Sequence, residues 1–393
     1  MNVDVIVIGA GAAGLMCAAS AAKRGRKVIV LDHANKPGKK ILMSGGGRCN
    51  FTNLDIRPEN YLSQNPHFCK SALSRYTQWD FIALVDEHGI PYHEKTQGQL
   101  FCDNKASDIL NMLLEECHRA NAAIHTSCAI TQIQKDEHFQ LETSLGHFSC
   151  DSLVIASGGL SIPTMGATGF GYQLAQQFGL HCLKTDAALV PFTLSDKNQH
   201  LAKSLSGLSL KVNATSKTKN FIDDLLFTHR GLSGPVILQL SNYWQLGESI
   251  EINLLPTQDI PTLADNWKQE KTKKELTSLL SHHLPKRFIQ QYLSELCGFD
   301  LTKTISSYSA ESIEQLSKHI HHWSITPSGT EGYRTAEVTS GGVNTDEISS
   351  KTFEAKKVPG LYFIGEVLDV TGWLGGFNFQ WAWSSGWCAG QYV

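Results

Sequence analysis

"VDVIVIGAGAAGLMCAASAAKRGRKVIVLD", residues 3–32 of the 393-residue chain, is the stretch that decides the fold. Residues 3–8 are β-branched at every position except Asp4, which predicts a strand buried on both faces. Residues 15–23 consist mostly of Ala, Leu and Met and predict a helix. Residues 27–31 predict a second apolar strand. This order of elements is typical of a Rossmann-like α/β domain.

The turn between the first strand and the helix has a glycine motif. Gly9, Gly11 and Gly14 form G-x-G-x-x-G, in which the glycines permit a tight turn, close approach of a pyrophosphate, and close packing of helix on strand. The helix N-terminus then stabilises phosphate. Asp32, at the end of the second strand, suits a ribose hydroxyl. A merely glycine-rich α/β start is the alternative, and we favour a nucleotide site. Its predicted neighbours are Ala12, Ala13 and His33.

A second glycine-rich segment, "GKKILMSGGGRCNFTN" at residues 38–53, follows soon after the second strand. This position places it beside the expected pyrophosphate, where adjacent glycines let backbone N–H groups face a cofactor. A flexible surface turn is the alternative, but such a turn has no evident need for three adjacent glycines with flanking cations. The residues expected to contribute are Lys39, Lys40, Gly45, Gly46, Gly47, Arg48 and Asn50.

The composition fits a soluble globular enzyme of two or three domains, with 41% apolar and 18% charged residues. A net charge of -3 gives no global attraction for nucleic acid or anionic lipid, although a local basic patch is compatible with it. The ten cysteines include no C-x-x-C pair, so free thiols in a reducing cytoplasm are expected. Residues 3–22 lack the basic start of a secretory signal, and no other stretch is apolar enough to span a bilayer.

Histidines and lysines in the later part of the chain suggest binding sites but fit a simpler explanation. His319 and His322 have helical spacing, yet no carboxylate or cysteine pattern completes a ligand set, so no metal is expected. The lysines within residues 268–274 are interleaved with acids. A solvated face is favoured over a nucleic-acid patch for this segment.

Three blocks make the chain resemble a known family. They are the 38–53 segment, "LFTHRGLSGP" at 226–235 and "GGFNFQWAWSSG" at 375–386. With these blocks the chain resembles the BaiN/RdsA family of NAD(P)/FAD-dependent flavoproteins over essentially its whole length. One stretch departs from the family, because residues 98–104 read "GQLFCDN" where relatives tend to have G-R-x-F-P. A role built on that arginine is therefore not carried over.

The resemblance implies an α/β fold in which a split Rossmann-like FAD-binding domain is interrupted by a small β domain and a helical subdomain. The change to short strands after residue 189, and then to polar helices after 257, gives the boundaries. The expected parts are 1–189 and 329–393 for the FAD-binding domain, 190–257 for the β domain and 258–328 for the helical subdomain.

The resemblance also implies further site residues. The strand and acids near the C-terminus meet the ribityl chain and pyrophosphate, and the last helix points its N-terminus at the flavin, where Asn378 and Gln380 are expected at the pyrimidine edge. The further cofactor-binding residues expected on this basis are Ile130, Gly158, Gly342, Gly365, Glu366, Asp369 and Gly376. The candidate proton donors, in order of preference, are Cys49, His229 and Thr228. A buried structural thiol is the alternative for Cys49.

The function expected from the resemblance is a cytoplasmic oxidoreductase that uses FAD and NAD(P)H to reduce an unsaturated acceptor. Relatives include an enzyme acting on a uridine of ribosomal RNA and another associated with bile-acid reduction. Ribosomal RNA is the marginally favoured acceptor, with no membrane and no metal involved. The alternatives are a small-molecule ene-reductase, a non-catalytic flavin-binding redox sensor, and a flavin hydroxylase or oxidase.

Overall fold

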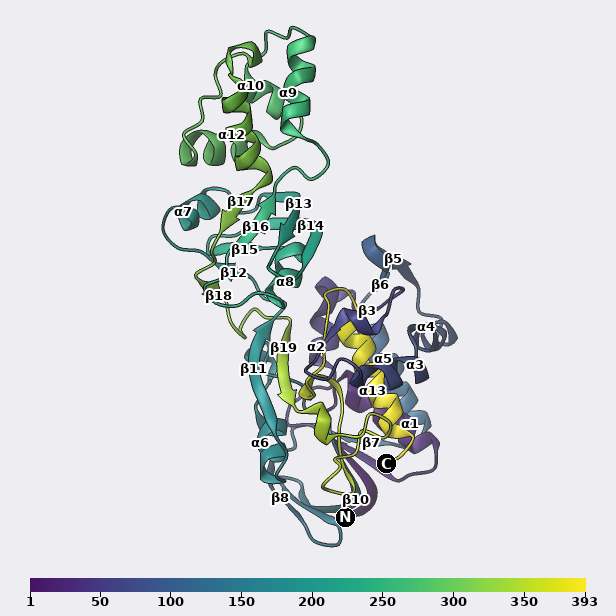
Figure 1. The fold of residues 1–393 in the computed structure, drawn as a ribbon. Coiled ribbons are helices and arrows are strands. Elements are labelled where there is room, and N and C mark those ends of the chain that lie inside the picture. The colour runs from purple at the N-terminus through teal and green to yellow at the C-terminus, as the bar shows by residue number, and fades with distance from the viewer. The chain divides into compact units, whose positions relative to one another are not determined.

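The computed structural model describes all 393 residues and consists of two compact units. The first unit combines Met1–Ala187 with Glu337–Val393, so both chain ends lie in it, and the second unit, Ala188–Ala336, is inserted between them (Figure 1). The predicted α/β fold with a split Rossmann-like domain is confirmed. No helix combines the length and the apolar character that crossing a bilayer requires.

The central sheet of the first unit is built on the N-terminal strand. Its order is β7-β2-β1-β10-β9-β8, with β20 also paired to β10. The pairs that involve β1, β2, β7 and β20 are parallel, whereas β8, β9 and the first half of β10 pair antiparallel. The strands are β1 (Asn2–Ile8), β2 (Val28–Leu31), β7 (Ala123–His125), β8 (Ile130–Lys135), β9 (Phe139–Thr143), β10 (Gly146–Ile155) and β20 (Leu361–Phe363).

Three small sheets and seven helices complete the first unit. The small sheets pair β3 (Asn50–Asn53) and β5 (Tyr92–Glu94) with β6 (Gln99–Cys102), β4 (Tyr61–Leu62) with β21 (Thr371–Gly372), and β11 (Cys182–Ala188) with β19 (Val338–Val343). The helices are α1 (Ala12–Lys23), α2 (Lys39–Met43), α3 (Phe68–Arg75), α4 (Gln78–Glu87), α5 (Ser107–Arg119), α6 (Phe170–Gln177) and α13 (Phe377–Gly390).

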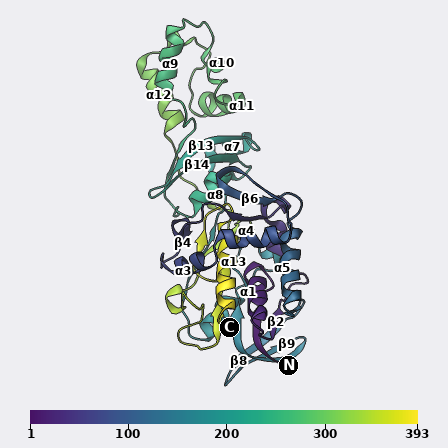
Figure 2. The same ribbon diagram turned by 90° about the vertical axis from the view of Figure 1, so that its right-hand side faces the viewer.

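The first and last helices pack closely against each other because both carry small residues at their contact. A Cβ atom on Gly386 of α13 would lie 2.4 Å from the Ala13 carbonyl oxygen, and one on Gly390 would lie 2.5 Å from the Ser20 Cβ atom. Figure 2 shows α13, α1 and α5 side by side. The contacts run in the same direction along both helices, so the N-termini of α1 and α13 lie at the same end of the pair. The two N-termini therefore point in the same direction along the pair.

The inserted unit is an antiparallel sheet with helices. The sheet has the order β17-β16-β13-β14-β15-β12-β18. Strands and helices share one hydrophobic core, in which Phe227 contacts Phe288 and Trp323, so the parts that the sequence divided at residue 257 form one unit. The strands are β12 (Phe192–Thr193), β13 (Ser209–Thr215), β14 (Asn220–Phe227), β15 (Gly231–Ser233), β16 (Ile250–Asn253), β17 (Trp323–Ile325) and β18 (Gly329–Thr330). The helices are α7 (Asp196–Ser204), α8 (Pro235–Ser241), α9 (Ile260–Gln269), α10 (Leu276–Leu280), α11 (Lys286–Phe288) and α12 (Ala310–His321).

Candidate functional site

The three motif glycines between β1 and α1 have different surroundings. Gly9 has a φ of +112°, and a Cβ atom there would lie 2.3 Å from the Ala156 carbonyl oxygen. A Cβ atom on Gly14 would lie 1.9 Å from the Gly9 carbonyl oxygen. Gly11, in contrast, has no atom within 4 Å of its Cβ position. The first and third glycines are therefore required by the protein itself, whereas the second borders open space.

That open space lies at the N-terminus of α1. The helix has no side-chain cap because its N-cap residue is Gly11, and its first turn, with Ala12 and Ala13, carries N–H groups that have no partner within the helix. Unpaired N–H groups and the positive end of the helix dipole stabilise an anion. The space above Gly11 is thus chemically suited to a pyrophosphate.

The carboxylate of Asp32 closes the glycine turn. Its Oδ2 atom accepts a hydrogen bond from the Ala10 N–H at 2.7 Å, and its Oδ1 atom accepts one from the Ala34 N–H, also at 2.7 Å. The side chain remains 14% exposed. Since each carboxylate oxygen has a second lone pair, Asp32 can accept a further bond from a ribose hydroxyl without giving up the turn.

The chain that flanks Asp32 is held by backbone bonds. The Cys128 N–H donates to the Asp32 carbonyl at 2.9 Å, and β8 begins two residues later at Ile130. His33 is exposed, and a Cβ atom on Gly166 would lie 3.1 Å from its Nε2 atom. Three predicted residues, Asp32, His33 and Ile130, therefore come from segments that lie together at this edge of the sheet.

The second glycine-rich segment adopts a conformation that only glycine tolerates well. Gly45, Gly46 and Gly47 have φ angles of +58°, +66° and +86° in succession. A Cβ atom on Gly45 would lie 2.8 Å from the Phe101 ring, while the positions on Gly46 and Gly47 are open. The three-glycine run therefore has a backbone reason, and two of its members leave room for close approach.

The polar residues beside this loop divide into exposed and bonded groups. Arg48 is exposed and Lys39 is half-buried, and neither makes an ion pair. The Asn50 amide bonds the Gln99 amide at 3.0 Å. Two cations are thus available to an anionic ligand, whereas Asn50 already has a partner in the protein.

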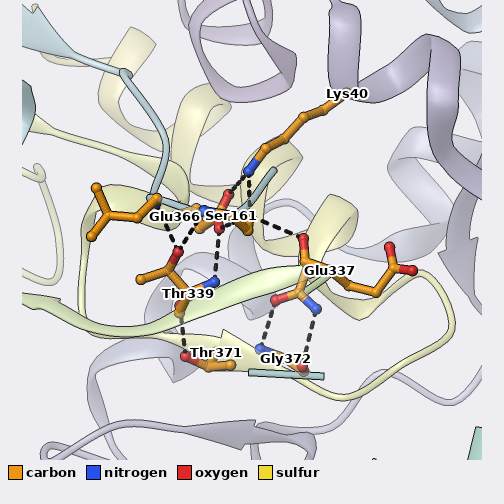
Figure 3. A network of polar contacts seen from close by, with 9 residues as sticks. Lys40, Ser161, Glu337, Thr339, Glu366, Thr371 and Gly372 are labelled. Atoms are coloured by element: carbon orange, nitrogen blue, oxygen red, sulfur yellow. Dashed lines mark hydrogen bonds and ion pairs between the residues drawn. The ribbon is translucent and has the colours of Figure 1, made fainter. Parts of the chain in front are cut away.

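An ion pair and two hydroxyls connect the two halves of the first unit. The Nζ atom of Lys40 donates to Oε2 of Glu366 and to Oγ of Ser161, both at 2.8 Å. The Oε1 atom of Glu366 accepts from the Thr339 N–H at 2.9 Å and from the Ser161 hydroxyl at 3.2 Å. The Thr339 hydroxyl accepts from the Ser161 N–H at 3.1 Å. Figure 3 shows these four residues converging from segments far apart in the sequence.

The N-terminus of α13 lies against β3. A Cβ atom on Gly376, the N-cap residue, would lie 2.4 Å from the Thr52 carbonyl, and no side chain caps the helix. The Asn378 amide accepts from the Gly372 N–H at 2.8 Å and donates to the Gly372 carbonyl at 2.9 Å. Gln380 has no exposed surface, and its amide accepts from the Thr52 hydroxyl at 2.7 Å. These two amides, which the sequence suggested as flavin contacts, make these hydrogen bonds within the protein.

Asp369 and several glycines, which were also predicted to bind the cofactor, have roles within the protein. The Asp369 carboxylate accepts from the Gln64 N–H at 2.8 Å, and burial raises the pKa of this carboxyl above its usual value. Positive φ angles occur at Gly158, Gly342 and Gly365, and a Cβ atom on Gly365 would lie 2.9 Å from the Cβ atom of Ala13. Glycine at 365 thus lets the C-terminal segment approach the first turn of α1.

The candidate proton donors lie in different units. Cys49, in the first unit, is 0% exposed and has a φ of +48°, and burial raises the pKa of its thiol to about 12. Thr228 and His229 belong to the turn between β14 and β15 of the inserted unit. The Thr228 hydroxyl accepts from the Gly231 N–H at 3.1 Å, while the His229 side chain is exposed.

Sequence reasoning missed the side-chain roles of Ser161, Thr339 and Thr52. The only local signal for Ser161 and Thr339 was a hydroxyl next to a glycine-rich turn. Ser161 bonds Thr339 and Glu366, and both of these partners are more than 170 positions away from it. Thr52 was visible only as a member of the 38–53 segment, and its partner is 328 positions away. Such pairs depend on the folded arrangement rather than on spacing.

The residues present fit a dinucleotide. Two uncapped helix N-termini, at Gly11 and Gly376, belong to helices that pack side by side. An acidic side chain with spare acceptor capacity follows β2, and a glycine loop with free cations follows it. The open Cβ position of Gly11 gives the approach that a pyrophosphate needs.

Three comparisons place this geometry among known proteins. The family described as "HI0933-like protein Rossmann domain" matches residues 3–392. A ribosomal RNA dihydrouridine synthase of Escherichia coli is 52% identical over 390 residues, which cover 99% of this chain and 97% of the relative. A 3-dehydro-bile acid delta(4,6)-reductase of Clostridium scindens is 27% identical over 98% of this chain and 97% of the relative. The solved 3-ketosteroid-delta4-(5alpha)-dehydrogenase of Rhodococcus jostii has a similar fold, with a TM-score of 0.51 at 14% identity over 99% of this chain and 97% of that one.

Proposed function

The chain belongs to the HI0933-like family, and from this membership we propose that it reduces a uridine of ribosomal RNA to dihydrouridine with electrons from NAD(P)H. Family membership makes it a flavoprotein oxidoreductase with a Rossmann-type nucleotide-binding domain. In the net reaction, the carbon–carbon double bond of the uracil ring gains a hydride and a proton, and the nicotinamide is oxidised. A ribosomal RNA substrate also implies that the enzyme works in the cytoplasm.

The choice of ribosomal RNA as the substrate rests on sequence identity to the two relatives. The chain is 52% identical to an enzyme named for ribosomal RNA and 27% identical to one named for a bile acid, at nearly the same coverage. Both relatives reduce double bonds by name, so the flavin site alone does not separate them. The higher identity over the whole length, including the inserted unit, supports the RNA substrate.

The cofactor that fits this site is FAD. We call the site, which is formed by the N-termini of α1 and α13, Asp32 and the glycine loop, the cofactor cradle. When bound, FAD supplies two-electron chemistry, accepting a hydride from the nicotinamide and passing it to the acceptor. We propose that the N-terminus of α1 and Asp32 hold the pyrophosphate and ribose, with Lys39 and Arg48 offsetting phosphate charge. The N-terminus of α13 would stabilise negative charge on a bound flavin ring.

The internal contacts keep this cradle assembled. Lys40, Ser161 and Thr339 hold the Glu366 side chain, and Asn378 fixes the turn before α13. No second G-x-G-x-x-G motif exists for the nicotinamide. We propose that NAD(P)H binds transiently over the flavin instead of occupying a domain of its own.

A reaction with defined components tests this function. Purified protein loaded with FAD is incubated with NADH or NADPH and with ribosomal RNA transcribed in vitro, which lacks modifications. Mass spectrometry of the digested RNA is expected to show dihydrouridine at one site, formed only when a reduced nicotinamide is present. RNA from cells that lack the gene should lose the same modification and regain it with the intact gene.

The same assay separates the alternatives. Flavin that is reduced by NAD(P)H and reoxidised by unsaturated steroid ketones, with no dihydrouridine in RNA, would identify a small-molecule reductase. Flavin that nicotinamides reduce only slowly would point to a redox sensor, and rapid peroxide formation in air would point to an oxidase. Each of these results contradicts the proposed function when the RNA contains no dihydrouridine.

A further inference from the structure

The inserted unit contains a small pocket, and the residues that line it are distant in sequence from the glycine motif. It is formed where α9 ends and where the chain passes residues 304–306 before α12, and its volume is about 200 Å³. Figure 1 shows α9, α10 and α12 grouped together in this unit. The residues that matter for its chemistry are Trp267, Lys268, Lys271, Lys273, Thr304 and Ser306. We call this set the lysine pocket.

The local backbone explains why three lysines surround one cavity. Helix α9 ends at Gln269, and Lys271 then takes a left-handed φ of +50°, which is uncommon for a residue other than glycine. The Lys271 N–H donates to the Lys268 carbonyl at 3.1 Å. This tight reversal brings the lysines before and after it to the same opening, above the buried Trp267.

The three lysines of the lysine pocket form no ion pair. None of Lys268, Lys271 and Lys273 lies within 4.0 Å of a carboxylate oxygen, whereas the nearby Lys303 pairs with Asp300 at 3.0 Å. Residues 268–275 contain four lysines and two glutamates, and neither glutamate lines the pocket. The solvated face expected from the sequence therefore has a local concentration of positive charge.

The hydroxyl groups and the volume of the pocket indicate which class of ligand it can bind. The Thr304 and Ser306 hydroxyls are hydrogen-bonded to each other at 3.2 Å, and Thr304 also bonds the Ser307 hydroxyl at 3.3 Å, so this group of hydroxyls keeps one O–H free to donate to a ligand. Ammonium and hydroxyl donors together suit phosphate oxygens. A volume of about 200 Å³ is below the range of roughly 300 to 1,000 Å³ that holds whole small-molecule ligands. The pocket thus suits a phosphate group that belongs to a larger molecule outside it.

We propose that the lysine pocket binds a backbone phosphate of the RNA substrate. This inference rests on the proposed function, because the macromolecule that presents the phosphate is the ribosomal RNA. Backbone phosphate contacts position a protein on RNA without reading sequence. The pocket therefore anchors the RNA, and the choice of uridine is made elsewhere.

The test compares two double variants with equal loss of charge. Lys271→Gln with Lys273→Gln removes two ammonium groups of the lysine pocket, and Lys203→Gln with Lys211→Gln removes two exposed lysines elsewhere in the same unit. Affinity for a ribosomal RNA fragment is measured over a range of salt concentrations, and flavin reduction by NAD(P)H is measured alongside. The pocket variant should lose roughly tenfold in RNA affinity and should show a smaller salt dependence, with flavin reduction unchanged.

The outcomes separate this inference from the proposed function. Lys271→Arg with Lys273→Arg should restore affinity, because the charge returns. Wild-type affinity in the pocket variant, or equal losses in both glutamine variants, would overturn the pocket as a specific phosphate site even if wild-type protein makes dihydrouridine. Absence of dihydrouridine with wild-type protein and RNA would instead overturn the proposed function, whatever the affinities show.

Discussion

The Nζ atom of Lys40 lies 2.8 Å from the Oε2 atom of Glu366, and this ion pair joins positions 326 residues apart. Because the inserted unit separates the two halves of the first unit in sequence, such contacts hold the halves together. Ser161 and Thr339 add hydroxyl and backbone bonds to the same carboxylate. The Glu366 side chain thus acts as a common acceptor for residues from three other segments.

Lys40→Met should lower the stability of the folded protein. The substitution keeps the length of the side chain but removes the ammonium group, so Glu366 loses its cationic partner while it is still largely buried. We expect a loss of about 1–2 kcal/mol in the free energy of unfolding, measured with urea. The control is Lys39→Met, since Lys39 makes no ion pair. Equal losses of stability in both variants would show that the ion pair itself contributes nothing.

Gly11→Val should abolish FAD binding without unfolding the protein. The Cβ position of Gly11 has no neighbour within 4 Å, and its extended backbone accepts a β-branched residue. The valine side chain then occupies the space that a pyrophosphate needs. We expect protein that is purified without flavin absorbance but unfolds at close to the temperature of flavin-free wild-type protein, and Gly11→Ala should retain part of the flavin. Full FAD content in Gly11→Val would mean that the pyrophosphate lies elsewhere.

Glu116 gives a pH-dependent contribution to stability. It is 5% exposed and contacts Lys23 and His88, the latter at 2.9 Å. Burial alone would raise the pKa of this carboxyl, but the hydrogen bonds from Lys23 and His88 outweigh burial and lower the pKa overall. A lowered pKa in the folded state means that the ionised carboxylate stabilises the protein above the unfolded-state pKa. That contribution disappears as the pH falls through the folded-state value.

Glu116→Gln tests this contribution by urea unfolding at several pH values. At pH 7 the variant should be less stable than the wild type by about 1–3 kcal/mol. The difference should shrink as the pH falls below about 4, the usual range for glutamate in unfolded chains. A difference that stays constant from neutral to acidic pH would assign the loss to packing instead of charge.

The parts of the fold that follow from local patterns were predictable. The strand, turn, helix and strand of residues 3–32 depend on neighbours in sequence, and the clash that a Cβ atom on Gly14 would make is with the Gly9 carbonyl of the same motif. The clash at Gly9 is with the distant Ala156 carbonyl, although the motif alone predicted glycine there. The positive φ angles of residues 45–47 likewise follow from a local run of glycines. For these segments the local sequence was enough to predict the backbone conformation.

The parts that depend on long-range contacts were not predictable. An amide at the start of a helix can face a ligand or the protein, and only the packing of α13 on β3 shows that Gln380 bonds Thr52. The partners of Glu366 come from segments that no spacing rule connects. Burial of Cys49 also depends on the whole core around it, so a motif that suggested a reactive thiol could not reveal its raised pKa.

Burial argues against the Cys49 thiol as the proton donor of the reaction. Cys49 has no exposed surface, and burial raises the pKa of its thiol to about 12, so Cys49→Ala should leave dihydrouridine formation nearly unchanged and cost about 1 kcal/mol of stability. His229 is exposed on a turn that the Thr228 hydroxyl stabilises, and histidine is the commonest general acid. His229→Ala should therefore lower the rate of dihydrouridine formation by about 10²-fold or more, while NAD(P)H still reduces the flavin at the wild-type rate. Rapid-mixing measurement of both half-reactions over a range of pH distinguishes the two residues. If Cys49→Ala loses the RNA half-reaction and His229→Ala keeps it, the buried thiol is the donor and must become accessible during turnover.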